Sequence, residues 1–274
     1  MKAQAQAVVV ALALVALAAC GEKKPAAPAA GGGTGGEAPA AAAANPGGGG
    51  GGDTKPYVAA EHTGSISGTV KFGGTAETAN PINVASDTFC NGAWPDGGPT
   101  DPKFTVNADT TLPNVFVYAK DGPQKGFGGY AVPTGFHVDQ KNCMYVPHVF
   151  GVMEGQSFLV KNSDQTTHNV NVKPKRNAPI NKGQGAGAED TLVFAKRDKA
   201  IPFTCDVHSW MSAYCWVLEH PFFATTDASG KFEIKGLPAG KYKFAIWHEK
   251  YGEAEFDVEV GADAKAVDWT LSGK

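Results

Sequence analysis

The sequence predicts an all-β protein, and three patterns support this prediction. Apolar and polar residues alternate in short runs, as in residues 64–72, where Ile66, Val70 and Phe72 fall on one face of a strand. Turn sequences separate the runs, for example Asp-Ala-Ser-Gly at 227–230. No stretch of a dozen residues has the apolar period of a helix. Short strands with frequent turns are typical of β-sandwiches and β-barrels.

Further strands are expected where β-branched and aromatic residues gather between turn signals. The Val-Phe-Val-Tyr run at 115–118 is the next candidate along the chain. The remaining candidates are residues 157–161, 168–172, 214–218, 231–235, 241–248, 254–260 and 266–271. Residues 173–190 are polar and rich in glycine, and we interpret them as a long loop.

Composition excludes two classes of protein. The 274 residues include 24 Lys or Arg and 27 Asp or Glu, a formal net charge of −3, which excludes a strongly basic nucleic-acid-binding protein. The second excluded class is a membrane-spanning helical protein. The long apolar run at residues 7–19 is shorter than the roughly 20 residues that a helix needs to cross a bilayer. The chain after residue 56 is long enough for one large domain or two small ones.

The first twenty residues have the features of an export signal. Lys2 supplies positive charge, an apolar run follows, and Leu-Ala-Ala-Cys closes it at residue 20. This ending resembles the lipobox of bacterial lipoproteins, which implies a signal peptide at 1–19 and a lipidated Cys20 that anchors the chain to a membrane. Gly21 follows the cysteine, which in Gram-negative lipoproteins permits export to the outer membrane. We therefore expect an exported, lipid-anchored protein at the periplasmic face, outer membrane or cell surface. An ordinary secretory signal is the alternative.

Residues 20–56 are expected to form a disordered linker. Gly, Ala and Pro dominate this stretch, so it cannot bury enough apolar surface to fold. A flexible chain of this length extends on average roughly 30–35 Å. The glycines at 47–52 have no phosphate-loop context and are interpreted as part of the linker.

Four cysteines remain if Cys20 is lipidated, namely Cys90, Cys143, Cys205 and Cys215. Four cysteines allow three complete pairings, and an exported protein reaches an oxidising compartment. We favour a Cys90–Cys143 disulfide, because the other two cysteines lie in a different chemical context.

Cys205 lies near several other side chains that can bind metals. Cys205, His208 and Met211 follow one another at three-residue intervals, so they can converge from a single tight loop, which His168 must reach from an adjacent strand. A thiolate, two imidazoles and a thioether are the ligands of a blue-copper site, in which methionine is the weak axial ligand. The sequence therefore predicts one mononuclear type 1 copper site.

The segment around these residues resembles the cupredoxin family. Its Cys-x2-His-x2-Met loop is similar to the short ligand loop of amicyanin-like members, and His-Asn-Val at 168–170 matches the family's first ligand. The resemblance covers about residues 136–220 and implies a Greek-key sandwich that binds copper. It assigns the ligand roles to His168, Cys205, His208 and Met211. It also gives Asn169 the role of holding the ligand loop in place.

Three features depart from the family pattern. Only one aromatic residue, Phe203, closely precedes Cys205, Trp210 is bulky for the ligand loop, and Cys215 has no counterpart. The alternative interpretation is a Cys205–Cys215 disulfide, with His208 capping a turn. A binuclear copper centre is disfavoured because it needs another cysteine four residues before Cys205, and zinc is disfavoured because methionine is a poor zinc ligand.

The regions on either side resemble a carboxypeptidase regulatory-like β-sandwich of transthyretin type. Residues 64–70 and 112–117 resemble its first strands, and the pattern resumes from 226 to 271. The resemblance implies one sandwich that is split in the sequence, with the cupredoxin domain inserted in it. The expected boundaries are 57–132 and 221–274 for the split sandwich and 133–220 for the inserted domain. Two sandwiches in series or one merged sheet system are the alternatives. The arrangement also resembles exported bacterial proteins labelled methylamine utilisation proteins, a label that establishes no pathway.

These features predict an electron carrier rather than an enzyme. The sequence has no hydrolase, metalloprotease or nucleotide-loop motif, and four protein ligands leave copper no open position for a substrate. His208 is the expected electron exit if it lies near the surface. The expected partner is a redox protein such as a cytochrome or a dehydrogenase. A copper-delivery protein and a metal-free, cupredoxin-like surface interaction module are the alternatives.

The other histidines are interpreted as structural. His220 and His248, which is beside Glu249, are expected to satisfy buried hydrogen bonds rather than to hold a second metal. His148 is expected in a strand. The basic residues of 173–182 are interpreted as a solvated loop rather than as a docking face for an acidic partner.

Overall fold

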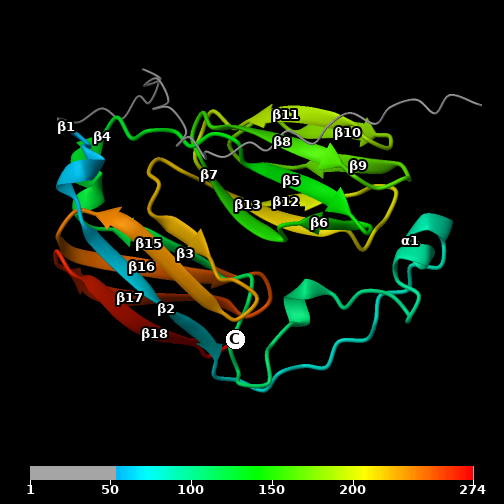
Figure 1. Ribbon diagram of the computed structural model, residues 1–274, viewed down its shortest axis with the longest axis horizontal. Helices are drawn as coiled ribbons and strands as arrows, with labels where there is room; N and C mark the ends of the chain where they lie inside the picture. Colours follow the sequence, from blue (N-terminus) through cyan, green and yellow to red (C-terminus); the bar gives the residue numbers. More distant parts are fainter. Residues whose placement is uncertain (1–53, 274) are drawn as a thin grey trace, which may run out of the picture. The chain divides into compact units, whose positions relative to one another are not determined.

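The computed structural model describes residues 54–273, and nearly all of its regular structure is β-structure (Figure 1). Within this part the chain forms eighteen strands, one α-helix and three short 3-10 helices, so the all-β prediction is confirmed. No helix in residues 54–273 has the length and apolar character needed to cross a membrane. The expected signal peptide, the lipidated Cys20 and the linker up to residue 53 lie outside the described residues.

Nine strands in the middle of the chain form a sandwich of two sheets, here called the central sandwich. They are β5 (His137–Lys141), β6 (Met144–Val146), β7 (Val149–Met153), β8 (Ser157–Asn162), β9 (His168–Val172), β10 (Ile180–Gln184), β11 (Glu189–Val193), β12 (Asp198–Thr204) and β13 (Ser212–Leu218). One sheet has the order β10-β9-β12-β13-β7 and the other the order β11-β8-β5-β6 (Figure 1). The chain passes repeatedly from one sheet to the other, and the predicted Greek-key sandwich is confirmed.

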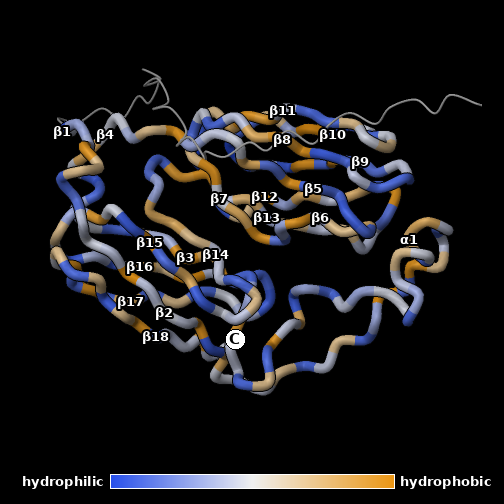
Figure 2. The backbone as a smooth tube through the Cα atoms, in the orientation of Figure 1, coloured by the Kyte–Doolittle hydropathy of each residue, from blue (hydrophilic) through white to orange (hydrophobic). Residues whose placement is uncertain are grey.

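The core of the central sandwich follows from the alternation of apolar residues along its strands. In β8, Phe158 and Val160 are buried, whereas Ser157 is exposed. Phe150 lies at the centre of this core, where its ring meets Phe158 and Phe203 edge to face at centroid distances of 6.0 and 5.4 Å. Figure 2 shows the same alternation as hydrophobic and hydrophilic colours along the strands. Burial of these aromatic rings fixes the two sheets against each other.

The predicted long loop at residues 173–190 is wrong in part, because it contains β10 and the beginning of β11. Both are edge strands of their sheets. Most side chains of β10 are exposed, so the strand is polar and carries no apolar alternation that would mark it in the sequence. It nevertheless pairs with β9 along its whole length and places Gln184 opposite His168.

A second sandwich, here called the flanking sandwich, is built from strands on both sides of the central one in the sequence. These strands are β2 (Gly64–Phe72), β3 (Phe116–Asp121), β14 (Phe223–Thr225), β15 (Lys231–Leu237), β16 (Gly240–His248), β17 (Gly252–Val260) and β18 (Ala264–Leu271). Its sheets have the orders β14-β3-β16-β17 and β15-β2-β18. Two further short strands, β1 (Lys55–Pro56) and β4 (Phe127–Gly128), pair in parallel.

The segment between β2 and β3 contains the single α-helix of residues 54–273, α1 (Thr88–Ala93). Asp87 caps its N-terminus by accepting a hydrogen bond from the Cys90 backbone N–H at 2.9 Å. The sequence boundaries place Val84 and Cys90 in the split sandwich, but both side chains are buried in the core of the central sandwich. A disulfide between Cys90 and Cys143 attaches the segment there. No strand pattern marks this segment in the sequence, so tertiary contacts determine where it packs.

His220 and His248 are buried and hydrogen-bonded in their neutral form. The Nε2–H of His220 donates to the Ala119 carbonyl at 3.0 Å, and its Nδ1 accepts from the Phe222 N–H at 3.3 Å. The Nδ1 of His248 accepts backbone N–H groups at 3.2 and 3.3 Å. Burial lowers the pKa of each imidazole to about 4. Among the described residues, no cluster of metal-binding side chains includes either histidine.

We predict that the free energy of unfolding decreases as the pH falls from about 6.5 to about 4. The folded-state pKa of His220 lies below its usual value of 6.5. The unfolded chain therefore gains a proton in this range before the folded chain does, and stability present above pH 6.5 is lost. Each buried histidine contributes about 3 kcal/mol to this loss. Urea unfolding of the protein at about pH 7.5 and about pH 4.5 measures it.

The matched variants are His220→Gln and His137→Gln, because His137 is exposed at the start of β5. The first variant should reduce the difference in stability between the two pH values, whatever its effect at neutral pH. The second should leave the difference unchanged. An equal pH dependence in both variants and the parent would contradict this assignment.

Candidate metal centre

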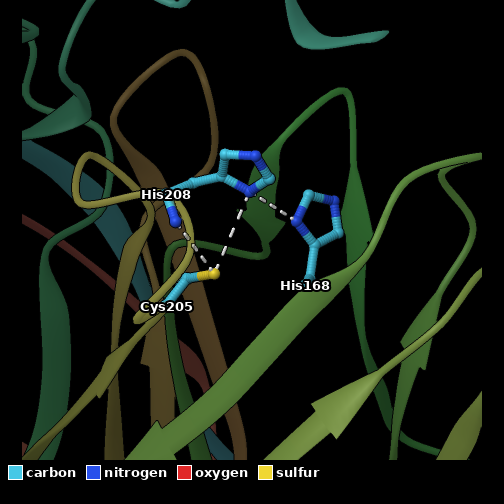
Figure 3. Close-up of side chains that lie close together, drawn as sticks. All are labelled: His168, Cys205 and His208. Carbon is cyan, nitrogen blue, oxygen red and sulfur yellow. Dashed lines mark hydrogen bonds between the residues drawn. The ribbon is translucent and has the colours of Figure 1, made fainter. Parts of the chain in front are cut away.

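Three buried side chains meet at one end of the central sandwich (Figure 3). His168 begins β9, Cys205 follows the last residue of β12, and His208 lies in the loop before β13. Their exposed fractions are 0%, 4% and 2%. One sulfur and two imidazole nitrogens from these residues lie within 4.8 Å of one another. The structure thus brings together three of the four predicted ligands through donor atoms of the predicted kind.

The pairing of β12 with β13 closes the loop that carries Cys205 and His208. Thr204 pairs with Ser212, so residues 205–211 form the connection. Within it, the Cys205 N–H donates to the Met211 carbonyl at 3.3 Å, and the Met211 N–H donates to the His208 carbonyl at 3.0 Å. Met211 is 1% exposed and belongs to the same buried cluster as Cys205. The segment that carries Cys205, His208 and Met211 at three-residue intervals is therefore a closed, hydrogen-bonded turn.

The Cys205 sulfur accepts two backbone hydrogen bonds, from the N–H groups of Asn169 and His208, both at 3.3 Å. Burial raises the pKa of the Cys205 thiol, but its hydrogen bond with His168 and the backbone N–H groups outweigh this effect and lower the pKa from its usual value. The thiolate is the form of cysteine that binds metals. The surrounding backbone therefore prepares Cys205 for this role.

The two imidazoles face each other through their Nδ1 atoms, which are 2.9 Å apart. Each Nε2 atom is engaged on the far side, that of His168 by Asp164 at 2.8 Å and that of His208 by Asp87 at 3.3 Å. Ionised carboxylates only accept hydrogen bonds, so both Nε2 atoms carry hydrogens. A further proton must then lie between the two Nδ1 atoms. A metal ion bound to both Nδ1 atoms would take the place of this proton.

The acid–base properties of the pair place the shared proton on His168. Burial lowers the pKa of His168, but Asp164 and Cys205 outweigh burial and raise it to about 9. Burial likewise lowers the pKa of His208, and there the hydrogen bond that its Nε2–H donates to Asp87 does not compensate. The metal-free site therefore pairs a protonated His168 with a neutral His208.

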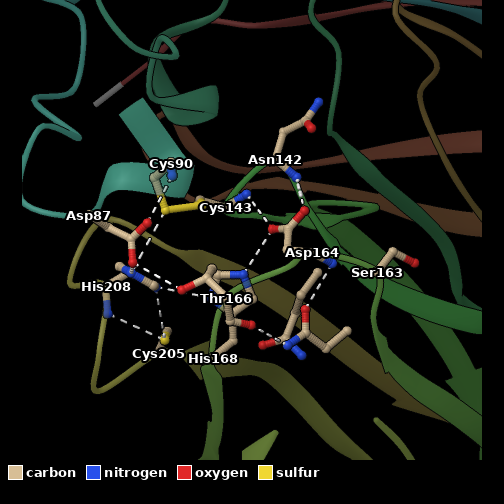
Figure 4. A network of polar contacts seen from close by, with 12 residues as sticks. Asp87, Cys90, Asn142, Cys143, Ser163, Asp164, Thr166, His168, Cys205 and His208 are labelled. Atoms are coloured by element: carbon tan, nitrogen blue, oxygen red, sulfur yellow. Dashed lines mark hydrogen bonds and ion pairs between the residues drawn. A yellow bond between two sulfur atoms is a disulfide. The ribbon is translucent and has the colours of Figure 1, made fainter. Parts of the chain in front are cut away.

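Asp164 holds the first histidine, a role that was not predicted from the sequence. Its carboxylate accepts the backbone N–H groups of Asn142 and Cys143, both at 2.7 Å, as well as the Nε2–H of His168 (Figure 4). The only hint in the sequence is that Asp164 comes four residues before His168. The turn between β8 and β9 is what brings the two side chains together.

Asn169 connects β9 to the ligand loop, which is the position proposed for it. Its side-chain oxygen accepts the Asp206 N–H at 3.2 Å, and its amide donates to Asn181 of β10 at 2.6 Å. The Asn171 side chain donates to the Asp206 carboxylate at 2.7 Å. The loop that carries Cys205 is thus tied to two neighbouring strands through side-chain amides.

The described cysteines divide into one disulfide and two free thiols. Cys90 and Cys143 form the disulfide, whereas Cys205 and Cys215 are free and buried. The alternative Cys205–Cys215 disulfide is therefore not formed. Two further groupings of possible ligands contain Cys90 or Cys143. Their sulfurs are committed to the disulfide, so only the group of His168, Cys205 and His208 keeps all its donors available.

This donor set fits a copper ion. Thiolate and imidazole ligands in a buried site, with a thioether nearby in the chain, are the ligands of blue-copper centres. Structural zinc sites usually offer four Cys or His ligands, whereas only three such residues converge here without a disulfide.

Comparisons with known proteins give low-identity structural likenesses only. No family model and no curated protein matches the chain. A copper-containing nitrite reductase (NirK) from Thermus scotoductus SA-01 is 19% identical over 32% of this chain and 23% of its own, with a TM-score of 0.30. A Cu(I) methionine-to-alanine mutant of amicyanin is 18% identical over 30% of this chain and 80% of its own, with a TM-score of 0.28. A purple cupredoxin from Nitrosopumilus maritimus is 17% identical over 30% and 99%, with a TM-score of 0.27.

We predict that Asp164→Asn lowers the free energy of unfolding of the metal-free protein by about 3 kcal/mol, because hydrogen bonds to a buried charged group are lost or left unsatisfied. Thermal or urea unfolding measures the loss. Asp139→Asn is the control, because the half-buried Asp139 accepts hydrogen bonds from the backbone N–H and the hydroxyl of Ser163 in a contact that is exposed to solvent. The control should lose less than about 1 kcal/mol. Similar losses in both variants would contradict the supporting role of Asp164.

Proposed function

We propose that this chain is a type 1 copper protein that transfers one electron at a time. The observation that carries the proposal is the convergence of the Cys205 sulfur and the facing Nδ1 atoms of His168 and His208 within 4.8 Å, in a buried site. Each donor is held by the fold before any metal binds. A site held in this way changes little between two oxidation states, which favours rapid electron exchange.

Each residue of the site has a distinct part in the proposal. Cys205 would supply the thiolate, His168 and His208 the two imidazole nitrogens, and Met211 a weak thioether ligand. Copper, when bound, supplies the change between the Cu(II) and Cu(I) states. The chain's contribution is to orient the two imidazoles, to hold the thiolate in its deprotonated form and to keep water from the ligands.

Electron transfer explains the burial of the site better than copper delivery does. A delivery protein hands its metal to an acceptor, which requires ligands that the acceptor can reach. Here the three ligands are 0–4% exposed, so an acceptor cannot reach them without opening the fold. A metal-free interaction module would in turn leave the N–H groups that point at the Cys205 sulfur without a purpose.

The location and partner are part of the same proposal. A lipid on Cys20 would hold the copper domain near a membrane on the exported side of the cell, within reach of a redox protein such as a cytochrome or a dehydrogenase. The flanking sandwich, with its likeness in sequence to carboxypeptidase regulatory-like domains, would serve as the frame for the copper domain.

We predict that the purified protein develops an intense blue or green band when Cu(II) is added, because sulfur-to-copper charge transfer requires the Cys205 thiolate. Cys205→Ala should abolish this band. The matched control is Cys215→Ala, since Cys215 is the other free buried cysteine and lies in β13. Visible absorption and electron paramagnetic resonance give the readout.

Two outcomes would contradict the proposal. One is a colourless protein that binds no copper while Cys205 is a free thiol. The other is a band that survives in Cys205→Ala and is lost in Cys215→Ala, which would place the metal at a different sulfur.

A further inference from the structure

His208 does not lie at the surface, so the expectation that it provides an exposed electron exit is not met. Figure 4 shows Asp87 and the Cys90–Cys143 disulfide beside its imidazole. Its Nε2 lies 3.3 Å from Asp87 and 3.7 Å from the Cys90 sulfur, and the Trp210 ring lies 5.0 Å from the imidazole, centre to centre. The exposed fraction of the residue is 2%. Asp87 and Cys90 belong to the α1 segment, which lies outside the cupredoxin-like part of the sequence, whereas Trp210 belongs to the ligand loop itself.

Asp87 is itself fixed by its surroundings. One carboxylate oxygen accepts the Cys90 N–H at 2.9 Å. The other accepts the Thr166 hydroxyl at 3.0 Å and faces the Nε2 of His208. The carboxylate therefore contacts α1, the turn before β9 and the ligand loop at once. Such a carboxylate cannot turn away from the imidazole without breaking the cap of α1.

The disulfide joins the two cysteines whose backbone N–H groups bind the carboxylates beside the histidines. The Cys90 N–H donates to Asp87, and the Cys143 N–H donates to Asp164. Asp87 engages His208 and Asp164 engages His168 through the equivalent Nε2 atoms. The Cys90–Cys143 bond thus connects the outer partners of both imidazoles.

We propose that Asp87 is the positioning residue of His208 and that the disulfide-linked α1 segment is a working part of the metal centre rather than a separate loop. The inference rests on the proposed copper-binding function. Asp87 fixes the hydrogen of His208 on Nε2, which leaves Nδ1 free to face the metal. Its negative charge also strengthens the imidazole as a ligand and favours Cu(II) over Cu(I).

Asp87→Asn tests this role, because asparagine caps a helix about as well as aspartate but carries no charge. We expect the Cu(II) dissociation constant to rise about 10-fold or more, as is typical for loss of an outer partner of a metal ligand. The reduction potential should rise as well. The matched control is Asp101→Asn in the same segment, where Asp101 caps a short helix through the Lys103 N–H at 3.1 Å. The control should leave affinity and potential unchanged.

A second readout needs no metal. Nitrogen NMR of the imidazoles in the metal-free protein should show His208 with its hydrogen on Nε2, and Asp87→Asn should increase the share of the other tautomer. If the parent protein gives no copper band but the tautomer changes as expected, the proposed function fails and the positioning role stands. If Asp87→Asn retains the parent's Cu(II) affinity and tautomer, the positioning role is overturned and Asp87 is only a helix cap.

Thr166→Val provides the test if Asp87→Asn does not fold. It removes one hydrogen bond that orients the carboxylate and leaves the charge in place. A weaker affinity for Cu(II), in the same direction and smaller than for loss of the charge, supports the proposal. An unchanged affinity and tautomer overturn it.

Discussion

The buried sulfur of Cys205 is the atom on which the site depends. A thiolate removed from water is costly unless hydrogen-bond donors or a cation surround it. Two backbone N–H groups supply part of that compensation, one from β9 and one from the ligand loop itself. Both donors reach the sulfur only if β9 lies beside β12 and the 205–211 turn is closed. The positions of His168 and His208 follow from those same two conditions.

The carboxylates that hold the two histidines come from different parts of the chain, and one of them lies far from its histidine in the sequence. Asp164 lies close to the residue it holds, but Asp87 comes from the segment between two strands of the flanking sandwich. A disulfide across 53 residues joins Cys90 and Cys143, whose backbone N–H groups bind these two carboxylates. The segment between β2 and β3 is therefore attached to the central sandwich beside the proposed metal centre. We infer that mutations in the α1 segment act on the proposed copper site even though the segment supplies no proposed ligand.

The convergence of His168, Cys205 and His208 could be predicted from the sequence because the last two lie in one short loop and His168 heads a recognisable strand. Most strands of the flanking sandwich, although not β14, could also be predicted, since apolar alternation and turn residues mark them. Edge strand β10 was missed because its side chains are mostly exposed. β12 was missed as a strand because Pro202 and the bulge between Asp198 and Ile201 interrupt its pattern. Asp87 could not have been found, because no local pattern connects a helix cap to a histidine 121 residues later.

In the proposed site, copper binds to one sulfur and two imidazole nitrogens of this chain. X-ray absorption at the copper edge measures those neighbours directly on the loaded protein. We expect a single short copper–sulfur distance together with two imidazole nitrogens, and loss of the short sulfur contribution in Cys205→Ala. A first shell of nitrogen and oxygen alone, unchanged in that variant, would contradict it.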